Sequence, residues 1–143
     1  MRSCGIDDDS QIRKLLARYA VAMDAADAEG VAALFAADGS MEILGSVIAG
    51  RAAIAATVRA YDEAGALQGG KHLTLNSLID VTGDRATARS DWLVVRVEGD
   101  AWTVFAAGHY DDELERVDGH WCFRRRVDVI EGPVPGVANA GVE

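Results

Sequence analysis

The chain has few residues of the kinds that build disulfide frameworks or transition-metal centres. It contains only two cysteines, Cys4 and Cys122, and three histidines, and none of them stands in a Cys-x-x-Cys, His-x-His or His-Glu-x-x-His spacing. A G-x-G-x-x-G fingerprint and a P-loop are also missing, which disfavours dinucleotide and nucleoside triphosphate cofactors. We therefore expect two free thiols, no metal and no cofactor.

Long apolar runs and an excess of basic charge are missing as well. No apolar run approaches the roughly 20 residues that a bilayer span needs, and the start MRSCGIDDDS is acidic where a signal peptide would be basic. The sequence has 14 Lys+Arg against 23 Asp+Glu, a net charge of −9, which repels phosphate backbones and anionic lipid. We expect a cytoplasmic protein that binds neither nucleic acid nor a membrane.

The chain is 143 residues long and 50% hydrophobic, which favours a single domain with a packed core. Helical spacing of apolar residues predicts a long helix over residues 7–29, with its stripe formed by Ile12, Leu15, Leu16, Tyr19 and Met23. Asp27 is expected to end this helix and to cap a short second one that carries Val31, Leu34 and Phe35. A short strand over 40–44 and a third helix over 51–61 follow.

The second half of the chain changes to four runs of alternating β-branched and aromatic residues, over 71–81, 86–98, 101–115 and 120–130. Gly83-Asp84, Gly99-Asp100 and Asp118-Gly119 separate them as short hairpin turns. Helices followed by an antiparallel meander predict an α+β fold, with the N-terminal helices on one face of a curved sheet. We place one domain over residues 7–130, with residues 1–6 and 131–143 as flexible tails or a flap over a pocket.

Two residues far apart in the sequence are candidates for acid–base chemistry. Asp24 lies at the rim of the apolar helix stripe, where it is either exposed and unimportant or a desolvated base. His72 begins a strand on which alternation places it on one face with Thr74, Asn76 and Leu78. That face is either solvent-exposed or the wall of a polar-lined cavity. If Asp24 orients His72, the imidazole becomes a competent general base near neutral pH.

Three further strands offer polar candidates. Asp91 shares a face with apolar neighbours and is either a strand-start residue near solvent or a buried, partnered carboxylate. Alternation from Trp121 and Phe123 points Arg125 into the core or pocket and Arg126 away from it, unless a bulge shifts the register. A solvated arginine cluster is the alternative for both. Tyr110 is either a core aromatic or a hydroxyl at the edge of a cavity.

Three stretches carry a resemblance to a known family, in the right order along the chain. RYAVAMDAADAEGVAALFAADG, KHLTLNSLIDVTGDRATARSD and AGHYDDELERVDGHWCFRRRV are similar to a SnoaL-like domain of the nuclear transport factor 2-like superfamily. The similarity spans about residues 10–130. It implies a cone, in which a strongly curved antiparallel sheet wraps around helices and encloses a deep pocket open at one end.

The resemblance also implies site residues. In scytalone dehydratase, bile-acid 7α-dehydratases and hexachlorocyclohexane dehydrochlorinase, a helix aspartate and a strand histidine form a dyad, and Asp24 and His72 match these two positions. Tyr19 falls on the helix tyrosine of the bile-acid enzymes and Asp91 near their strand carboxylate. The Arg125/Arg126 region matches an arginine that follows a Trp-x-Phe/Ile pattern.

Two departures separate the chain from scytalone dehydratase. That enzyme has a second pocket histidine where this chain offers Asp91 and Arg96, and Met23 replaces the tyrosine directly before its aspartate. SnoaL-type polyketide cyclases use an aspartate on the sheet as acid and base, a role that Asp91 could fill. These differences leave the substrate open.

The leading functional hypothesis is a lyase or isomerase of dehydratase type that works without a cofactor on a hydrophobic small molecule, such as a steroid, terpenoid or polyketide. Asp24, His72, Tyr19 and Asp91 are the expected catalytic residues. The expected substrate contacts are Arg125, Arg126, Asn76, Tyr110 and Met23. The alternatives are a polyketide cyclase or double-bond isomerase at the same site, and a non-catalytic ligand-binding module or oxygenase β-subunit-like scaffold. A homo-oligomer, dimer or trimer, is also expected.

Overall fold

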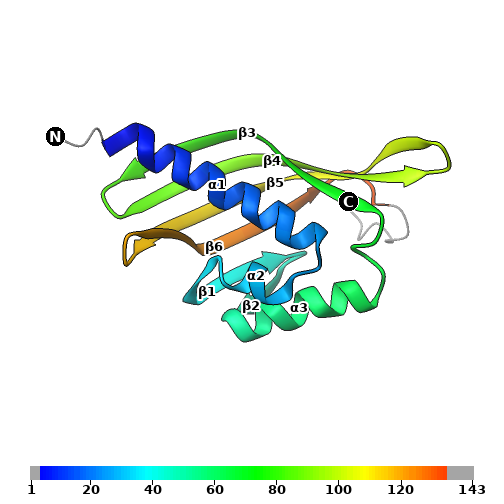
Figure 1. The fold of residues 1–143 in the computed structure, drawn as a ribbon, viewed down its shortest axis with the longest axis horizontal. Helices are drawn as coiled ribbons and strands as arrows, with labels where there is room; N and C mark the ends of the chain where they lie inside the picture. Colours follow the sequence, from blue (N-terminus) through cyan, green and yellow to red (C-terminus); the bar gives the residue numbers. More distant parts are fainter. Residues whose placement is uncertain (1–3, 135–143) are drawn as a thin grey trace.

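The computed structural model describes residues 4–134, with side chains from residue 7 onward (Figure 1). Three helices and six strands follow one another along the chain: α1 (Cys4–Asp24), α2 (Ala28–Ala32), β1 (Phe35–Ile43), β2 (Ser46–Ala49), α3 (Arg51–Glu63), β3 (Gly70–Thr82), β4 (Arg85–Glu98), β5 (Ala101–Val117) and β6 (His120–Glu131). No helix in this part of the chain has both the length and the apolar character to cross a membrane.

The six strands form one sheet in the order β2-β1-β6-β5-β4-β3. Strands β3 to β6 are the predicted antiparallel meander, and each lies within two residues of its expected bounds. β1 pairs in parallel with β6, so the sheet as a whole is mixed. Figure 1 shows α1 crossing one face of the meander while α2 and α3 lie beside β1 and β2. The α+β class is confirmed. We call the face under α1 the inner face and the opposite one the outer face.

The apolar stripe of α1 packs on the inner face as predicted. Ile12, Leu15, Leu16, Tyr19 and Met23 are all buried there. Facing them are small or aromatic residues of the sheet, including Ala88, Trp92, Tyr110 and Phe123. Gly108 makes room for one of these rings, because a Cβ at this position would lie 2.6 Å from the indole of Trp92. The core therefore depends on alternating large and small residues across neighbouring strands.

The link from α1 to β1 differs partly from the expected one. Asp27 caps α2, and its Oδ1 accepts a hydrogen bond from the backbone N–H of Gly30 at 3.0 Å, as predicted. However, α2 ends at Ala32, so Leu34 and Phe35 are not helical. The backbone N–H of Phe123 in β6 donates to the carbonyl oxygen of Leu34, which draws the chain into the sheet. Strand pairing with a distant segment thus starts β1 earlier than local pattern suggests.

A β-bulge in β3 changes which side chains share a face. Asn76 has a φ of 53°, and the pairing of β3 with β4 shifts between Leu75 and Leu78. Consequently Ser77 follows His72 and Thr74 on the inner face, whereas Leu78 points outward. The predicted grouping of Asn76 and Leu78 with His72 is wrong, because the extra residue reverses the alternation beyond it.

The ends of the chain are described in part. Of the expected tails, residues 1–3 and 135–143 lie outside the described residues. Glu131 still belongs to β6, and Val134 packs against the core.

Candidate functional site

Asp24 and His72 meet where the end of α1 lies beside the start of β3. The Nδ1 atom of His72 lies 2.7 Å from Oδ1 of Asp24, and the backbone N–H of His72 donates to the same oxygen at 2.9 Å. The side chain of His72 is 16% exposed and that of Asp24 is 22% exposed. The pair is therefore partly desolvated but still accessible from outside.

This geometry determines which ring nitrogen of His72 can react. An ionised carboxylate only accepts hydrogen bonds, so the ring must present Nδ1–H to Asp24. The other nitrogen, Nε2, is then the one able to take a proton. Asp24 would stabilise the imidazolium that forms, which is the chemistry expected of an oriented general base.

A second group of polar side chains lies deeper on the inner face, around Arg126. Its guanidinium carbon lies 3.5 Å from the ring centroid of Tyr110, 4.1 Å from that of Tyr19 and 4.6 Å from that of Phe123. Nε of Arg126 lies 3.3 Å from Oδ1 of Asp112, and both side chains are 0% exposed. The ion pair is thus enclosed by aromatic rings whose faces favour a cation.

Neither member of this ion pair has its hydrogen-bonding capacity filled. Within residues 4–134, no hydrogen-bond partner is found for Nε, Nη1 or Nη2 of Arg126, or for either carboxylate oxygen of Asp112. Buried polar groups without partners are rare and costly. Burial also raises the pKa of the Asp112 carboxyl to about 6, although the positive charge of Arg126 opposes this rise.

In the structure, Arg125 and Arg126 face the opposite sides of the sheet from those that strict alternation predicts. The pairing of β5 with β6 shifts between Glu113 and Leu114, so Arg126 takes the inner position and Arg125 the outer one. Arg125 is about half exposed, and its Nη2 donates to Glu42 at 3.0 Å. The expectation that Arg125 points inward is wrong for this reason.

The sequence-based prediction did not name two carboxylates of the inner face, Asp112 and Asp128. Asp112 could have been found, because alternation along β5 places it between Tyr110 and Leu114, both of which are buried. Asp128 follows Arg126 by two residues and is carried inward by the same bulge. Burial raises its pKa to about 6, while Arg126 and the nearby indole N–H of Trp92 lower it.

The two predicted tyrosines are both in the interior. The rings of Tyr19 and Tyr110 pack edge to face with centroids 5.8 Å apart, and the hydroxyl of Tyr19 donates to Sδ of Met41 at 3.4 Å. Burial raises the pKa of both hydroxyls, so both remain protonated near neutral pH. Met23 is buried in the same core. The two tyrosines can donate hydrogen bonds but do not act as anions near neutral pH.

Two other candidates do not join the Asp24–His72 pair. Asp91 lies on the outer face, between the inward-facing Ser90 and Trp92. Its Oδ2 accepts a hydrogen bond from Nδ2 of Asn76 at 2.8 Å, and Asn76 is exposed. The structure therefore brings Asp91 and Asn76 to one another, on the side of the sheet away from His72.

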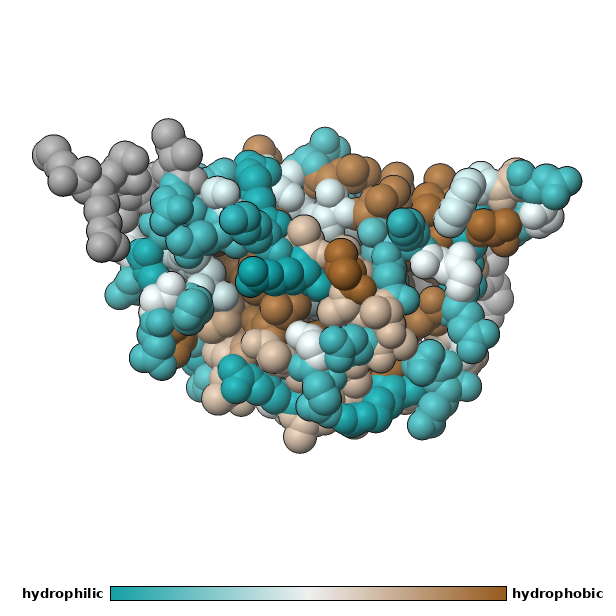
Figure 2. All heavy atoms as spheres, in the orientation of Figure 1, coloured by the Kyte–Doolittle hydropathy of each residue, from teal (hydrophilic) through white to brown (hydrophobic). Residues whose placement is uncertain are grey.

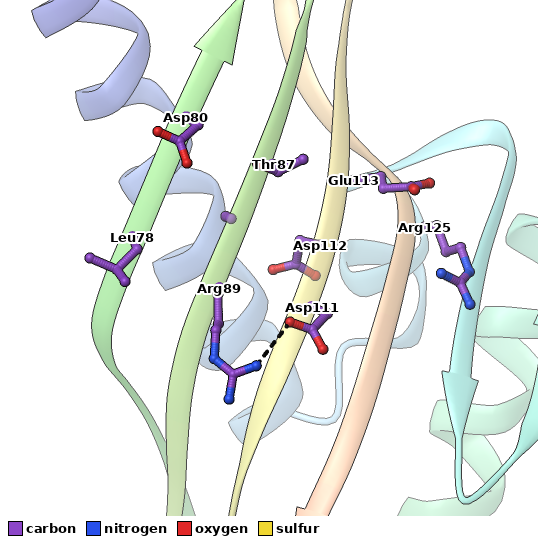
Figure 3. A pocket seen from close by; sticks show the side chains of 9 residues that line it. Leu78, Asp80, Thr87, Arg89, Asp111, Asp112, Glu113 and Arg125 are labelled. Atoms are coloured by element: carbon purple, nitrogen blue, oxygen red, sulfur yellow. Dashed lines mark hydrogen bonds and ion pairs between the residues drawn. The ribbon is translucent and has the colours of Figure 1, made fainter.

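Two hollows in the surface lie away from the pair as well. One of about 390 Å³ is on the outer face, where Arg89 reaches toward Asp111 and Arg125 borders the far side (Figure 3). The other, of about 520 Å³, lies between α1 and α2 and is lined by Val21, Leu34 and alanines with Lys14 and Arg18. Figure 2 shows hydrophobic atoms bordered by hydrophilic ones on this helical face. Neither hollow includes Asp24 or His72, so the deep pocket implied by the resemblance stays a prediction.

Comparison with known proteins matches the model of the SnoaL-like domain family to residues 5–127. The chain belongs to this family. Among solved structures, it is 34% identical to Rv3472, a Mycobacterium tuberculosis protein of unknown function, with a TM-score of 0.81 over 92% of this chain and 82% of that one. None of the curated proteins matches the sequence significantly.

Two structures from Novosphingobium aromaticivorans are also similar to this SnoaL-like protein. An NTF2-like protein with a cystatin-like fold is 29% identical, with a TM-score of 0.80 over 94% of this chain and 87% of that one. A provisionally assigned scytalone dehydratase is 24% identical, with a TM-score of 0.77 over 97% of this chain and 100% of that one. The latter likeness shows the fold alone. Together these findings confirm the superfamily inferred from the sequence.

Proposed function

We propose that this SnoaL-like protein is an acid–base enzyme, a lyase or isomerase that needs no cofactor and acts on a hydrophobic small molecule. The observation that carries the proposal is the contact between Nδ1 of His72 and Oδ1 of Asp24 at 2.7 Å. The two residues are 48 positions apart in the sequence, so only the fold brings them together. A carboxylate that holds an imidazole in one tautomer is a recurrent arrangement for general-base catalysis.

In the proposed reaction, Nε2 of His72 abstracts a proton bound to carbon and Asp24 stabilises the resulting imidazolium. The electron pair left on carbon forms the C=C bond as the C–O bond breaks. The leaving hydroxide takes a proton from solvent and departs as water, and the imidazolium then returns its proton to solvent. Apolar walls would keep bulk water from the base. Arg126 takes the place of Arg125 as the inward-facing cation, and its field favours negative charge that develops on the substrate.

Isomerisation and aldol-type cyclisation remain the alternatives within this class, because they need the same base and differ in where the proton returns. Steroids, terpenoids and polyketides that carry a carbonyl group fit the proposal as substrates, since the carbonyl acidifies neighbouring C–H bonds and the skeletons are apolar. The provisional name of the dehydratase with the same fold is compatible with this class.

The proposal can be tested with 5-nitrobenzisoxazole, a small aromatic probe that opens to a nitrile and a phenolate when a base removes one C–H proton. We expect the wild-type protein to accelerate this reaction and His72→Gln to lower the rate by about 10²–10⁴-fold. Asp24→Asn should lower it as well, because the ring loses its orienting carboxylate. His120→Gln is the matched control, since His120 is exposed at the start of β6.

Equal rates for wild type, His72→Gln and His120→Gln would contradict the proposal. A non-catalytic ligand-binding module or an oxygenase β-subunit-like scaffold would give that result.

We also propose that copies of the chain associate through the outer face. Leu78, Trp102 and Val104 are 70%, 62% and 63% exposed there, and Leu73 and Leu75 lie beside them on β3. Exposed apolar side chains in such number on one sheet face are typical of an interface. The neighbouring Arg89 and Asp111 supply both signs of charge, as a self-complementary surface requires.

A further inference from the structure

The two ends of the outer face differ in shape and in chemistry. At the β4–β5 hairpin the side chains are apolar and protrude: Val97 is 53% exposed, and its cross-strand partner Trp102 is 62% exposed. At the other end lies the hollow of about 390 Å³ that Arg89 and Asp111 border (Figure 3). We call it the outer hollow. One end therefore presents a large aromatic ring, and the other presents an open space.

The strand register shows where these two features lie relative to one another. On β4, Val97 pairs with Trp102 and Arg89 pairs with Asp111, and Leu93 stands halfway between Val97 and Arg89. All three β4 positions are on the outer face, because side chains alternate along a strand. The usual rise per residue separates the ring from the outer hollow by about 26 Å along the strands. Leu93 marks the midpoint of this distance.

A two-fold axis between two such sheets can run across the strands or along them. An axis across the strands at Leu93 exchanges the two ends, so it places the Trp102 end of each copy against the outer hollow of the other. An axis along the strands brings each end against the same end of the other copy, so ring faces ring and hollow faces hollow. In an isologous contact, each patch must match the patch that the axis brings to it. Shape therefore favours the axis across the strands.

The charged side chains of the outer face favour the same axis. Lys71 on β3 is exposed and pairs with Val95, which lies beyond Leu93 toward the hairpin. Asp91 lies at the same distance on the other side of Leu93, on the same face. The axis across the strands brings Lys71 of one copy to the level of Asp91 of the other, where opposite charges attract. The axis along the strands keeps each charge at its own level, where like charges repel.

The outer hollow suits an indole in size and in chemistry. Ligand pockets in proteins begin at about 300 Å³, so a hollow of about 390 Å³ accommodates one aromatic side chain. Arg89 and Arg125 line it, and both side chains are about half exposed. A guanidinium is attracted to the face of an aromatic ring, most strongly to that of tryptophan. Leu78 adds an apolar side to the hollow.

We propose that two copies of the chain form an isologous dimer in which Trp102 of each copy enters the outer hollow of the other. The inference rests on the association through the outer face proposed above and specifies its arrangement. Each indole then buries about 150–250 Å². The contact leaves the Asp24–His72 pair uncovered, because that pair lies on the inner face.

Cross-linking tests this arrangement. Cys4→Ser and Cys122→Ala remove the native thiols, Trp102→Cys and Asp111→Cys are introduced together, and a short bismaleimide is added. Both positions are more than half exposed, so the core is not disturbed. We expect most of this protein to become a covalent dimer, because each new thiol at 102 faces the one at 111 of the other copy. Within one copy the two thiols are about 26 Å apart along the strands, so the linker cannot join them.

The single variants Trp102→Cys and Asp111→Cys are the matched controls. In the proposed dimer each thiol lies about 26 Å along the strands from its counterpart in the other copy, so neither variant should cross-link. A covalent dimer of Trp102→Cys alone would establish the axis along the strands and overturn the proposal. An absence of cross-linking in the protein with both thiols, when light scattering shows a dimer, would overturn it as well. A monomer by light scattering would refute the association itself, and the arrangement with it.

A second measurement follows the affinity of the dimer. Arg89→Ala should raise the dissociation constant by about tenfold in sedimentation equilibrium, because the indole of the other copy loses its guanidinium partner. Arg85→Ala is the matched control, since Arg85 is an exposed cation at the start of the same strand and does not line the outer hollow. It should leave the dissociation constant unchanged. An Arg89→Ala variant that dimerises as tightly as the wild type would overturn the placement of Trp102.

Discussion

Each face of the sheet carries an ion pair between an arginine and a carboxylate, and the two pairs differ in their exposure to solvent. On the outer face, Arg125 and Glu42 form an ion pair at 3.0 Å whose side chains are 48% and 27% exposed. On the inner face, the next residue, Arg126, pairs with Asp112 at 3.3 Å and both are 0% exposed. The outer pair keeps water as a partner, whereas no hydrogen-bond partner is found for the inner pair within residues 4–134.

Two adjacent arginines thus differ in the free-energy cost of their charge, because Arg125 stays hydrated and Arg126 has lost its water. Exposed ion pairs contribute about 0–1 kcal/mol, because water screens the attraction and the side chains lose freedom. A buried pair has lost its hydration, so each member depends on the other. Three predictions follow the contrast from the interior outward.

The largest effect is expected from removing one member of the inner pair. Arg126→Met should lower the free energy of unfolding by about 3–5 kcal/mol, because Asp112 is then left buried without a counter-charge. Arg125→Met should change it by less than about 1 kcal/mol. Urea unfolding followed by tryptophan fluorescence measures both values.

The double variant Arg126→Met, Asp112→Leu sharpens the same comparison. It should recover most of the loss, since no unpaired charge remains. Similar losses for Arg126→Met and Arg125→Met would show that the two faces do not differ as described.

A smaller effect, on the order of 2–3 kcal/mol, is expected from pH. The pKa of Asp112 is about 6 in the folded protein, above the ordinary value of 3.8, so the folded state binds this proton more tightly than the unfolded state. Its contribution to stability is present below pH 4 and is lost as the pH rises through 6. In Asp112→Asn, stability should depend less steeply on pH over this window. A slope in Asp112→Asn as steep as that of the wild type would contradict the burial argument.

The smallest effect on stability is expected at the outer face. Trp102→Lys should change the free energy of unfolding by less than about 0.5 kcal/mol, because the side chain is 62% exposed. It should nevertheless lower the molar mass seen by light scattering, since the proposed contact between copies would bury a charge. Val21→Lys, at an exposed position of α1, is the control. A monomeric wild type, or an unchanged mass in Trp102→Lys, would remove the basis for association through this face.

The regular elements could be predicted because their signals are local. The stripe from Ile12 to Met23 and the alternation of residues 71–130 repeat with the periods of a helix and of strands, and the glycines mark the turns. The start of β1 could not be predicted in the same way, and β2 (Ser46–Ala49) was not predicted at all. Leu34 bonds to Phe123, and such a distant backbone partner leaves no trace in a local pattern.

The site was predictable only in part, for the same reason. Asp24, His72, Tyr19 and Tyr110 were named as candidates from helix and strand patterns, and their catalytic or binding roles stay predictions. Arg125 was placed inward and Asp128 was missed, because one extra residue in β6 reverses every face assignment after it. A bulge depends on how two strands fit together, and a single strand does not reveal it.

The sequence by itself determined the class of fold and the helix that covers the sheet, and it named two candidate residues for proton transfer. It did so because propensity, hydrophobic period and turn residues act over a few neighbours along the chain. Only the tertiary structure decided that Asp24 reaches His72, that Arg126 rather than Arg125 enters the interior, and that Asp112 and Asp128 lie beside it. These outcomes depend on strand register and burial, which arise when segments far apart in the sequence pack together and exclude water.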